Sequence, residues 1–478
     1  MAEGAGARVP SGAVLGELAA ALGGELRGDA SVRVSGATHD SRKVKPGWLF
    51  CAVEGELHDG IDFVDAAERA GATAVLAQRA PLTGLPFVLV DDVRCAMAEA
   101  AALIHGKPAD ALRIVGITGT NGKTTVASIL GGLLTHHGSR TRVLGTLSGA
   151  RTTPESTDLQ EQLAAFVQDG TTHVVMEVSS HALSLHRVDG ITFEVGVFTN
   201  LGSDHLDFHG NPEAYFQAKA GLFDAGRCVH AVLNIDDVHG RLLADAVEMP
   251  VSGFSVDAIE DLTTDSSGSR FTWRSQAVHL PLPGRHNVAN ALAAAESAAA
   301  LGMGVEEIVA GLSAAEAVPG RFEVVRAMSD QVTVVVDYAH TPDALQNALD
   351  AARGLVDPGG SLAVVFGCGG DRDRDKRPAM GSVATRGADR VVLTDDNPRS
   401  EDPVGIIEDI LRGCDDSVVV QHDRRAAIHM AVSGAGAGDV VLIAGKGHET
   451  TQQYGDRVER FDDRVVVAEE LRRLGGQR

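Results

Sequence analysis

The stretch that decides the fold is Arg113-Ile-Val-Gly-Ile-Thr-Gly-Thr-Asn-Gly-Lys-Thr-Thr125. It indicates a short apolar strand, a glycine-rich turn and a helix that begins near Lys123. Backbone N–H groups in such a turn point at phosphate oxygens, and Lys123 and Thr124 would then serve the β/γ-phosphates and Mg²⁺. The spacing departs from the strict G-x-x-x-x-G-K-[ST] pattern, because Ile117 stands at its first position. The other interpretation is a glycine turn beside an unrelated surface lysine; we favour an ATP site.

Length and composition set the class of the protein. At 478 residues the chain is long enough for about three domains of ~150 residues each. Aromatic residues make up only 4% and hydrophobic residues 44%, which favours an α/β protein over a β-sandwich or a disordered chain. The formal net charge of −23 argues against binding nucleic acid through the overall field. Phosphate ligands must therefore be held by local loops and helix ends.

The cysteine pattern points to a reducing compartment. No C-x-x-C pair is present, which argues against a disulfide framework and a zinc ribbon. The five cysteines are Cys51, Cys95, Cys228, Cys368 and Cys414. The first residues lack the basic-then-apolar pattern of a signal peptide, and no apolar run approaches the roughly 18–20 residues that span a bilayer. We therefore expect a cytoplasmic protein with no membrane insertion.

Alternating strand and helix signals divide the chain into three α/β blocks, which we expect at residues 1–110, 111–317 and 318–478. The second and third blocks are typical of parallel, doubly wound sheets, and Pro319-Gly320 supports the boundary between them. The expected strands of these blocks are Arg113–Thr118, His173–Val178, Glu194–Thr199, His230–Asn234, Val332–Asp337, Ser361–Phe366, Arg390–Thr394, Ser417–Gln421 and Val440–Ala444. The main expected helices begin at Asn287, Val305 and Pro342.

Polar clusters follow nearly all of these strands. Ligands of open α/β sheets bind beyond the carboxyl ends of the strands, so this placement is informative. Each cluster alone has an ordinary interpretation as a helix cap, a turn or a salt-bridged loop. Six of them in a chain with a phosphate loop favour one composite site. The clusters are Glu177 with Ser179-Ser180-His181, Asn200 with Asp204-His205, Asp337 to Pro342, Gly367 to Arg377, Asp395 to Arg399, and Gly445 to Glu449.

Several segments in order resemble the motifs of a known family. The chain is similar to the Mur ligases, the ATP-dependent amino-acid-adding enzymes of peptidoglycan precursor synthesis, from about Thr38 to Asp463. The resemblance implies an N-terminal UDP-binding α/β domain, a central P-loop ATPase-like parallel-sheet domain and a C-terminal Rossmann-like domain. The matching segments are Gly119–Thr125, Glu177–Leu183, Thr199–Leu201, Asp204–Gly210, Gly284–Leu292, Pro319–Arg321 and Val336–Leu345.

Other motifs resemble one group within that family, whose members add meso-2,6-diaminopimelate to UDP-N-acetylmuramoyl-L-alanyl-D-glutamate. Such an enzyme moves the γ-phosphoryl of ATP onto the D-glutamate carboxylate, and the incoming amine then displaces phosphate from the acyl phosphate. Charge accumulates on phosphoryl oxygens, so metal ions and cationic side chains should dominate catalysis. The motifs are Asp40-Ser-Arg42, Thr152-Thr153, Ser179-Ser-His181 and Asp396-Asn-Pro-Arg399.

Three alternatives stay open at this point. They are a Mur-type ligase that adds L-lysine, a folylpolyglutamate synthase, which lacks the separate first domain, and a switch that hydrolyses ATP without ligating anything. A switch would not need both the acyl acceptor and a free amino acid. For the ligase we expect a monomer.

The resemblance also assigns nucleotide and metal roles. It implies ATP binding by Gly119, Thr120, Asn121, Gly122, Lys123, Thr124, Thr125, Asn287, Arg321 and Asp337. It implies Mg²⁺ binding by Thr124, Glu177, His205 and Lys219, with Lys219 carbamylated by CO₂ so that it presents an anion. Lys123, Glu177, His205 and Lys219 are the expected catalytic residues. Without the resemblance, Lys219 would be interpreted as a surface lysine of a helix.

The remaining assignments concern the other two substrates. The UDP-muramoyl dipeptide is expected at His39, Ser41, Glu56, Leu57, His58, Thr152, Thr153, Ser179 and Arg187. Leu185 replaces a glutamine found in some relatives, so one polar substrate contact is missing or supplied elsewhere. His39 replaces an apolar residue, which matters less if only its backbone contacts the uracil. Diaminopimelate is expected at Arg372, Asp396, Asn397, Pro398, Arg399, Gly445 and Glu449.

Arg399 is the residue that we expect to determine which amino acid the enzyme adds. Its guanidinium would pair with the distal carboxylate of diaminopimelate, which lysine lacks, and Glu449 would accept from the distal ammonium. In the other interpretation Arg399 pairs with Glu401 or Asp402 on a solvated loop.

Overall fold

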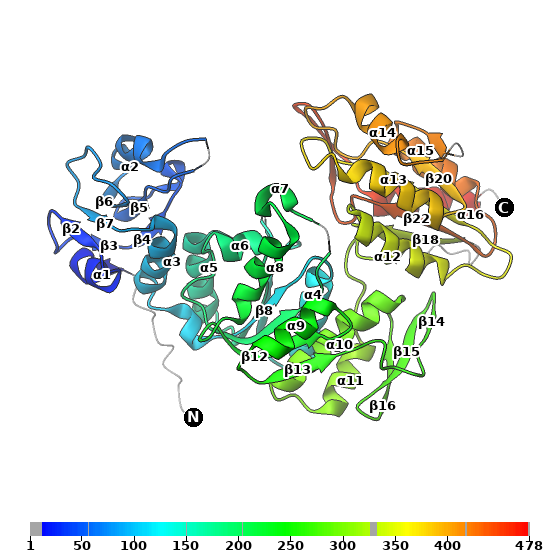
Figure 1. Ribbon diagram of the computed structural model, residues 1–478, viewed down its shortest axis with the longest axis horizontal. Coiled ribbons are helices and arrows are strands. Elements are labelled where there is room, and N and C mark those ends of the chain that lie inside the picture. Colours follow the sequence, from blue (N-terminus) through cyan, green and yellow to red (C-terminus); the bar gives the residue numbers. More distant parts are fainter. Residues whose placement is uncertain are drawn as a thin grey trace.

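The computed structural model describes residues 12–55, 57–149, 151–202, 204–325, 332–415 and 418–476. The chain forms three α/β units in a row, with the central unit between the other two (Figure 1). Among the described residues, every helix is too short or too polar to span a lipid bilayer.

The central unit is built on a six-stranded parallel sheet whose strand β8 (Arg113–Thr118) leads into the glycine-rich turn. Ile114, Val115 and Ile117 are fully buried, because helices cover both faces of the sheet and the strand needs no polar face. The strand order reverses beside β8, which places the turn at the edge where such sheets bind ligands. The spatial order is β13 (Val251–Phe254), β12 (Cys228–Asn234), β11 (Phe193–Phe198), β8, β10 (His173–Glu177) and β9 (Thr141–Leu144).

Helices on the two faces of this sheet bury two separate apolar cores. The first core contains side chains of α4 (Lys123–His136), α10 (Arg285–Ala300) and α11 (Val305–Ser313). The second contains side chains of α5 (Ser156–Gln168) and α9 (Val238–Ala246). The short helices α6 (Ser180–Ser184), α7 (Leu206–His209) and α8 (Pro212–Ala220) lie after strand ends.

An antiparallel sheet that the sequence did not predict extends the first core. It consists of β14 (Thr263–Asp265), β15 (Gly268–Trp273) and β16 (Gln276–Leu280). Phe271, Trp273 and Val278 alternate with exposed residues, so one face packs on the core that includes α11.

The C-terminal unit is a doubly wound sheet with one antiparallel edge strand, β17. Its order is β17 (Glu323–Val325), β18 (Val332–Asp337), β22 (Asp439–Ala444), β19 (Leu362–Phe366), β20 (Arg390–Leu393) and β21 (Val418–Val420). One face is covered by α12 (Pro342–Arg353), α13 (Lys376–Gly387) and α14 (Pro403–Leu411), and the other by α15 (Arg424–Ser433) and α16 (Asp463–Gly476). The hairpin of β23 (Thr451–Tyr454) and β24 (Arg457–Arg460) follows β22.

The N-terminal unit is a smaller mixed sheet. Its order is β2 (Glu25–Arg27), β7 (Phe87–Leu89), β6 (Ala72–Ala77), β5 (Trp48–Cys51) and β4 (Gly36–Thr38). The other elements are α1 (Leu15–Ala21), α2 (Val64–Arg69), α3 (Val93–Ile104) and the two-residue pair of β1 (Ala13–Val14) with β3 (Arg33–Val34). Helix α3 packs against α5, so it joins this unit to the central one (Figure 1).

The predicted α/β class with parallel sheets is confirmed. The strands at Arg113–Thr118 and Val332–Asp337 have the predicted bounds, and the others differ by one or two residues at an end. Ser417 of the predicted strand Ser417–Gln421 lies outside the described residues. The domain bounds 1–110, 111–317 and 318–478 stay a prediction.

Candidate functional site

The glycine-rich turn is held by the end of the neighbouring strand β11. Gly119 has a φ of +142°, and a Cβ at this position would lie 1.9 Å from the Thr199 hydroxyl oxygen, so no side chain fits. Thr199 Oγ1 donates to Asn121 O at 2.6 Å, Thr120 N donates to Asn200 O at 2.9 Å, and Asn121 N donates to Asn200 Oδ1 at 3.0 Å. The turn is therefore fixed before any ligand arrives.

A cleft of about 830 Å³ between the central and C-terminal units collects most of the predicted site residues. Its lining includes strand ends of both sheets, as the sequence pattern predicted. The predicted residues that line it are Thr120, Asn121, Gly122, Lys123, Thr124, Thr125, Thr152, Thr153, Glu177, Ser179, Arg187, His205, Asn287, Arg321, Asp337, Arg372, Asp396, Arg399, Gly445 and Glu449. The described predicted residues outside the lining are His39, Ser41, Leu57, His58, Gly119, Lys219, Asn397 and Pro398. Glu56 lies outside the described residues.

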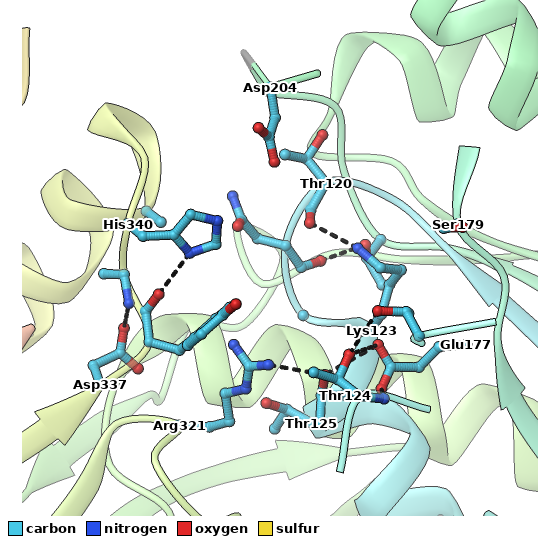
Figure 2. Close-up of a pocket in the computed structure, with 18 of the residues that line it drawn as sticks. Thr120, Lys123, Thr124, Thr125, Glu177, Ser179, Asp204, Arg321, Asp337 and His340 are labelled. Carbon is cyan, nitrogen blue, oxygen red and sulfur yellow. Dashed lines mark hydrogen bonds between the residues drawn. The ribbon is translucent and has the colours of Figure 1, made fainter. Parts of the chain in front are cut away.

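Two lysines approach the glycine-rich turn. Lys123 Nζ donates to Gly119 O at 2.8 Å and to Thr120 O at 2.9 Å (Figure 2). Lys219, on α8, is 1% exposed and donates to Gly119 O at 2.9 Å, with Nζ 4.3 Å from the centre of the Tyr215 ring. Burial, and then the Lys123 ammonium, hold the pKa of Lys219 well below its ordinary value. The structure thus places an amine that readily loses its proton beneath the turn.

Oxygen atoms cluster at the start of α4. Thr124 Oγ1 donates to Glu177 Oε2 at 3.1 Å, and Glu177 also accepts from the backbone N–H of Thr146 at 2.8 Å and from its hydroxyl at 3.2 Å. Figure 2 shows Glu177 and Thr124 turned toward one another beside Lys123. Thr153 Oγ1 donates to Glu177 O at 2.8 Å and accepts from Ser179 N at 3.1 Å, which fixes the strand end that carries Glu177.

His205 lies in a cluster of rings with His181 and Tyr215. Its Nε2 is 3.4 Å from Asp204 Oδ2, and its ring meets His181 edge-on at 4.8 Å between centroids. Desolvation by the surrounding atoms lowers the pKa of the half-exposed His205, which favours the neutral imidazole that can ligate a metal. Burial also lowers the pKa of His181 and of His209 to about 4.

The C-terminal unit reaches across the cleft with Arg321. Its Nη2 donates to Thr124 Oγ1 at 3.2 Å, and its guanidinium lies 4.3 Å from the centre of the Tyr338 ring (Figure 2). Asp337 accepts from the backbone N–H of Phe322 at 2.6 Å and of Ala339 at 2.8 Å. Its carboxylate therefore connects the segment that carries Arg321 to the segment that carries Tyr338. Asn287, at the start of α10, donates to Pro283 O at 2.8 Å.

Arg399 points into the cleft without a carboxylate partner in the described part of the chain. Its Nη1 donates to Gly370 O at 2.6 Å, which is its one side-chain hydrogen bond there. Glu401 instead pairs with Arg377 at 3.0 Å and Arg374 at 3.1 Å, and Asp402 caps α14. The interpretation of Arg399 as a partner of Glu401 or Asp402 is therefore wrong.

Glu449 lies on the same side of the cleft as Arg399. Asn397 Nδ2 donates to its Oε2 at 2.7 Å, and the fully buried Lys446 ammonium donates to the same oxygen at 3.1 Å. Asn397 thus positions Glu449 from behind the cleft wall. The end of β22 before Gly445 is held by a buried ion pair, in which Arg424 binds Asp463 at 2.7 Å and Ala444 O at 2.9 Å.

Arg187 lines the end of the cleft nearest the N-terminal unit. Its Nη2 donates to Glu155 Oε1 at 2.8 Å, whereas its buried Nε has no hydrogen-bond partner among the described residues. His39 lies close enough for Glu155 and Asp158 to act on its charge, and burial lowers its pKa. Lys43 pairs with Asp158 at 3.2 Å, which ties the segment of His39 and Ser41 to α5. Leu57 and His58 are exposed on a loop of the N-terminal unit.

Several lining residues were not singled out from the sequence. Thr146 holds Glu177, yet it follows the short, half-exposed edge strand β9, which sequence reasoning did not find. Tyr338, His340 and Lys376 also line the cleft. All three stand in or beside quoted strand-end clusters, so a search of whole clusters would have found them.

Three family models match successive parts of the chain. They are "Mur ligase family, catalytic domain" at residues 33–105, "Mur ligase middle domain" at 117–298 and "Mur ligase, glutamate ligase domain" at 320–447. The chain belongs to the Mur ligase family. The Mur ligases are ATP-dependent ligases, and this chain is therefore an ATP-dependent ligase.

Among its relatives is a Mur ligase of Streptomyces coelicolor named UDP-N-acetylmuramoyl-L-alanyl-D-glutamate–2,6-diaminopimelate ligase. It is 44% identical over 496 residues, which cover 97% of each chain. A solved structure with the same name is 35% identical, covers 97% of this chain and 99% of its own, and has a TM-score of 0.69. The MurF ligase of Thermotoga maritima in complex with ADP shares the fold at 22% identity, with a TM-score of 0.64 and coverage of 92% and 97%.

Proposed function

We propose that this protein uses ATP to join meso-2,6-diaminopimelate to UDP-N-acetylmuramoyl-L-alanyl-D-glutamate through an acyl phosphate, in peptidoglycan precursor synthesis. The observation that carries the proposal is the shared cleft. It brings the phosphate loop of the central unit opposite a guanidinium, Arg399, that lacks a carboxylate partner among the described residues. The names of the relatives support the same activity.

Arg399 and Glu449 account for the choice of amino acid. The distal end of diaminopimelate carries one carboxylate and one ammonium, and these match a forked cation and a positioned carboxylate. L-Lysine would occupy the same cleft but leave the partly buried guanidinium of Arg399 without an anion. Arg372, Asp396 and Gly445 line the same wall. Asn397 and Pro398 act in this proposal by shaping the loop that carries Arg399.

The nucleotide is proposed to lie on the glycine-rich turn, in contact with residues 119–125. Asn287, Arg321 and Asp337 would enclose it from the far side of the turn and from the C-terminal unit. Arg321 already bonds Thr124, so the two units approach each other without a ligand. A Mur ligase of Thermotoga maritima that was solved with ADP supports this use of the fold.

The oxygen donors near Lys123 fit a hard divalent cation. Thr124 Oγ1 and Glu177 Oε2 are 3.1 Å apart, and hydroxyl and carboxylate oxygens are the donors that Mg²⁺ prefers. Thr124 would hold one Mg²⁺, and Glu177 and His205 would hold a second; when bound, these ions neutralise charge on the phosphoryl oxygens. Lys123 contributes to the same end as a fixed cation at the turn.

The surroundings of Lys219 support the proposal that its side chain is carbamylated. A neutral amine reacts with CO₂, and the low pKa of Lys219 keeps its amine neutral at physiological pH more readily than that of an exposed lysine. Carbamylation would release one proton to solvent, and the product would be an anion that attracts the nearby Lys123 ammonium. The carbamate would supply a further oxygen to Mg²⁺.

The UDP-muramoyl dipeptide is proposed to lie across the junction of the N-terminal and central units. Arg187 Nε offers a buried donor there, and Thr152, Thr153 and Ser179 continue the same wall into the cleft. His39, Ser41 and the loop of Glu56, Leu57 and His58 would receive the uridine end.

The test offers a panel of free amino acids with the UDP-muramoyl dipeptide and Mg-ATP, and measures the mass of the product and the phosphate released. We expect one amide product, with diaminopimelate, and phosphate release that requires both the acyl acceptor and the amino acid. A lysine-containing product in equal yield would overturn the specificity. ATP hydrolysis that needs neither substrate would overturn the ligase function.

A further inference from the structure

A cluster of three different metal-ligating side chains lies outside the cleft, where the N-terminal unit meets the central one. Cys95 comes from α3, and His186 and Asp189 come from the loop between α6 and β11. One ligand atom from each lies within 4.8 Å of the others, and it is the one such group of three or more found in the described part of the chain. No step of the proposed ligase reaction uses these residues.

The geometry points to a binding site for a zinc-type divalent transition-metal ion at Cys95, His186 and Asp189. Thiolate, imidazole and carboxylate are the ligand types of such ions, and three protein ligands leave a fourth tetrahedral position for water. The half-exposed His186 and the exposed Cys95 leave solvent access for that water. A hard ion such as Mg²⁺ would not be retained by a thiol.

Small movements would complete the coordination. Asp189 Oδ2 is 2.6 Å from His186 Nδ1 and 4.0 Å from Cys95 Sγ. With metal–ligand bonds of about 2.0–2.3 Å, tetrahedral ligand atoms lie about 3.4–3.6 Å apart. The His–Asp pair must therefore open, and the Cys–Asp pair close, by less than about 1 Å, which is within reach of side-chain rotation.

The surroundings already orient the ligands. Arg227 Nη2 donates to Asp189 Oδ1 at 2.9 Å, so the carboxylate oxygen that would not bind the metal is held by an outer partner. His186 adopts a φ of +56°, which is uncommon for a residue other than glycine, and this backbone turns its ring toward Asp189.

The local charge favours a cation. The carboxylates of Asp189, Asp92 and Glu99 all act electrostatically on Cys95. Metal binding would release the thiol proton to solvent and leave a thiolate bound to the ion. The same acidic groups attract the incoming dication.

The proposed metal site lies where the N-terminal unit meets the central unit, so a bound ion would join the two. A bound ion would link α3 of the N-terminal unit to the loop that carries Arg187. The ion would thus connect the two units that are proposed to share the UDP-muramoyl dipeptide. Binding to the folded chain also raises the midpoint of thermal unfolding.

The test is a Co²⁺ titration of the full chain in excess Mg²⁺, which occupies hard-oxygen sites. We expect one Co²⁺ per chain with a thiolate-to-cobalt charge-transfer band in the near ultraviolet. Cys95→Ser should abolish the band, and His186→Gln and Asp189→Asn should weaken binding more than about 100-fold, beyond what loss of an outer partner typically costs. Two matched controls should keep the band: Cys414→Ser, which removes another accessible thiol, and Glu99→Gln, which removes a neighbouring charge.

Thiol alkylation followed by site-resolved mass spectrometry gives a second readout. Zn²⁺ should protect Cys95 and leave the labelling rate of Cys414 unchanged. The inference is overturned if wild type binds Co²⁺ without a thiolate band, if the band survives in Cys95→Ser, or if Zn²⁺ protects neither thiol. Loss of ligase activity has no part in these readouts, so failure of the proposed function would leave them interpretable.

Discussion

Replacement of Arg399 by alanine tests how the cleft chooses its amino acid. The guanidinium uses one N–H for Gly370 O and leaves its remaining donors for a carboxylate. The guanidinium is expected to donate two charge-assisted hydrogen bonds to the distal carboxylate of diaminopimelate, and the loss of each costs about 1.5–3 kcal/mol of binding free energy. Because Arg399 is partly exposed, we use the lower value of that range. A total of about 3 kcal/mol corresponds to roughly 10²-fold.

We therefore expect the KM for diaminopimelate to rise on the order of 10²-fold in Arg399→Ala, with the KM for ATP nearly unchanged. Steady-state kinetics with each substrate varied in turn measures both. The preference over L-lysine should shrink by a similar factor, because the variant no longer leaves a guanidinium without an anion when lysine binds.

Two further variants separate the side chain from the backbone and from net charge. Arg399 has a φ of +52°, so Arg399→Gly relaxes the backbone while it also removes the guanidinium, and it should match Arg399→Ala. Arg374→Ala removes an equal charge from an exposed side chain that pairs with Glu401 outside the cleft, and it should behave like wild type. A KM for diaminopimelate within about tenfold of wild type in Arg399→Ala would refute the reasoning.

Three other outcomes follow from the site. Lys123→Ala should fold normally but lose a factor on the order of 10²–10³ in kcat, because it removes a cation beside the phosphoryl group. Circular dichroism checks the fold and a turnover assay checks kcat. Near-normal turnover would contradict the assignment of Lys123. Lys219→Ala should be inactive and regain part of its activity with acetate or formate, which can replace the carbamate; full activity without them would contradict the carbamate. His181 and His209 have a pKa of about 4, against an ordinary 6.5, because their partial burial disfavours the charged form, so the unfolded chain takes up protons that the folded chain does not. The free energy of unfolding should be unaffected by these groups above pH 6.5, fall as pH drops toward 4, and fall less steeply in His181→Gln; urea titrations at several pH values measure the slope, and an unchanged slope would contradict it.

The parallel strands and their ends could be predicted from the sequence because a strand that is buried on both faces has apolar residues at successive positions. The strands Arg113–Thr118 and Val332–Asp337 contain the continuous apolar runs Ile114–Ile117 and Val334–Val336, and the polar residues that follow these runs lie at the ligand edge of each sheet. The strand β9 was missed because it is half-exposed, and Thr146 was missed with it. The antiparallel strands β14 to β16 were missed because their alternation is short and interrupted by turn residues.

Pairings between distant residues could not be predicted, because one sequence carries no sign of them. Glu401 follows Arg399 closely in the chain, yet it binds Arg377 from a separate helix, α13, and so leaves Arg399 for the cleft. The burial of Lys219 beneath Gly119 depends likewise on how α8 docks, and the helix alone would suit a surface lysine equally well. The meeting of Cys95 with His186 depends on the contact between two units.

The attachment of the glycine-rich turn to Thr199 and Asn200 has a consequence for the order in which a ribosome delivers the chain. The turn is synthesised well before these two residues, and until they emerge its backbone has no strand end to bind. At typical rates of about 5–20 residues per second, the nascent turn waits on the order of ten seconds for its partner. During that interval the apolar strand β8 is also unpaired on the β11 side, so its backbone hydrogen-bonding groups on that edge have no strand to pair with.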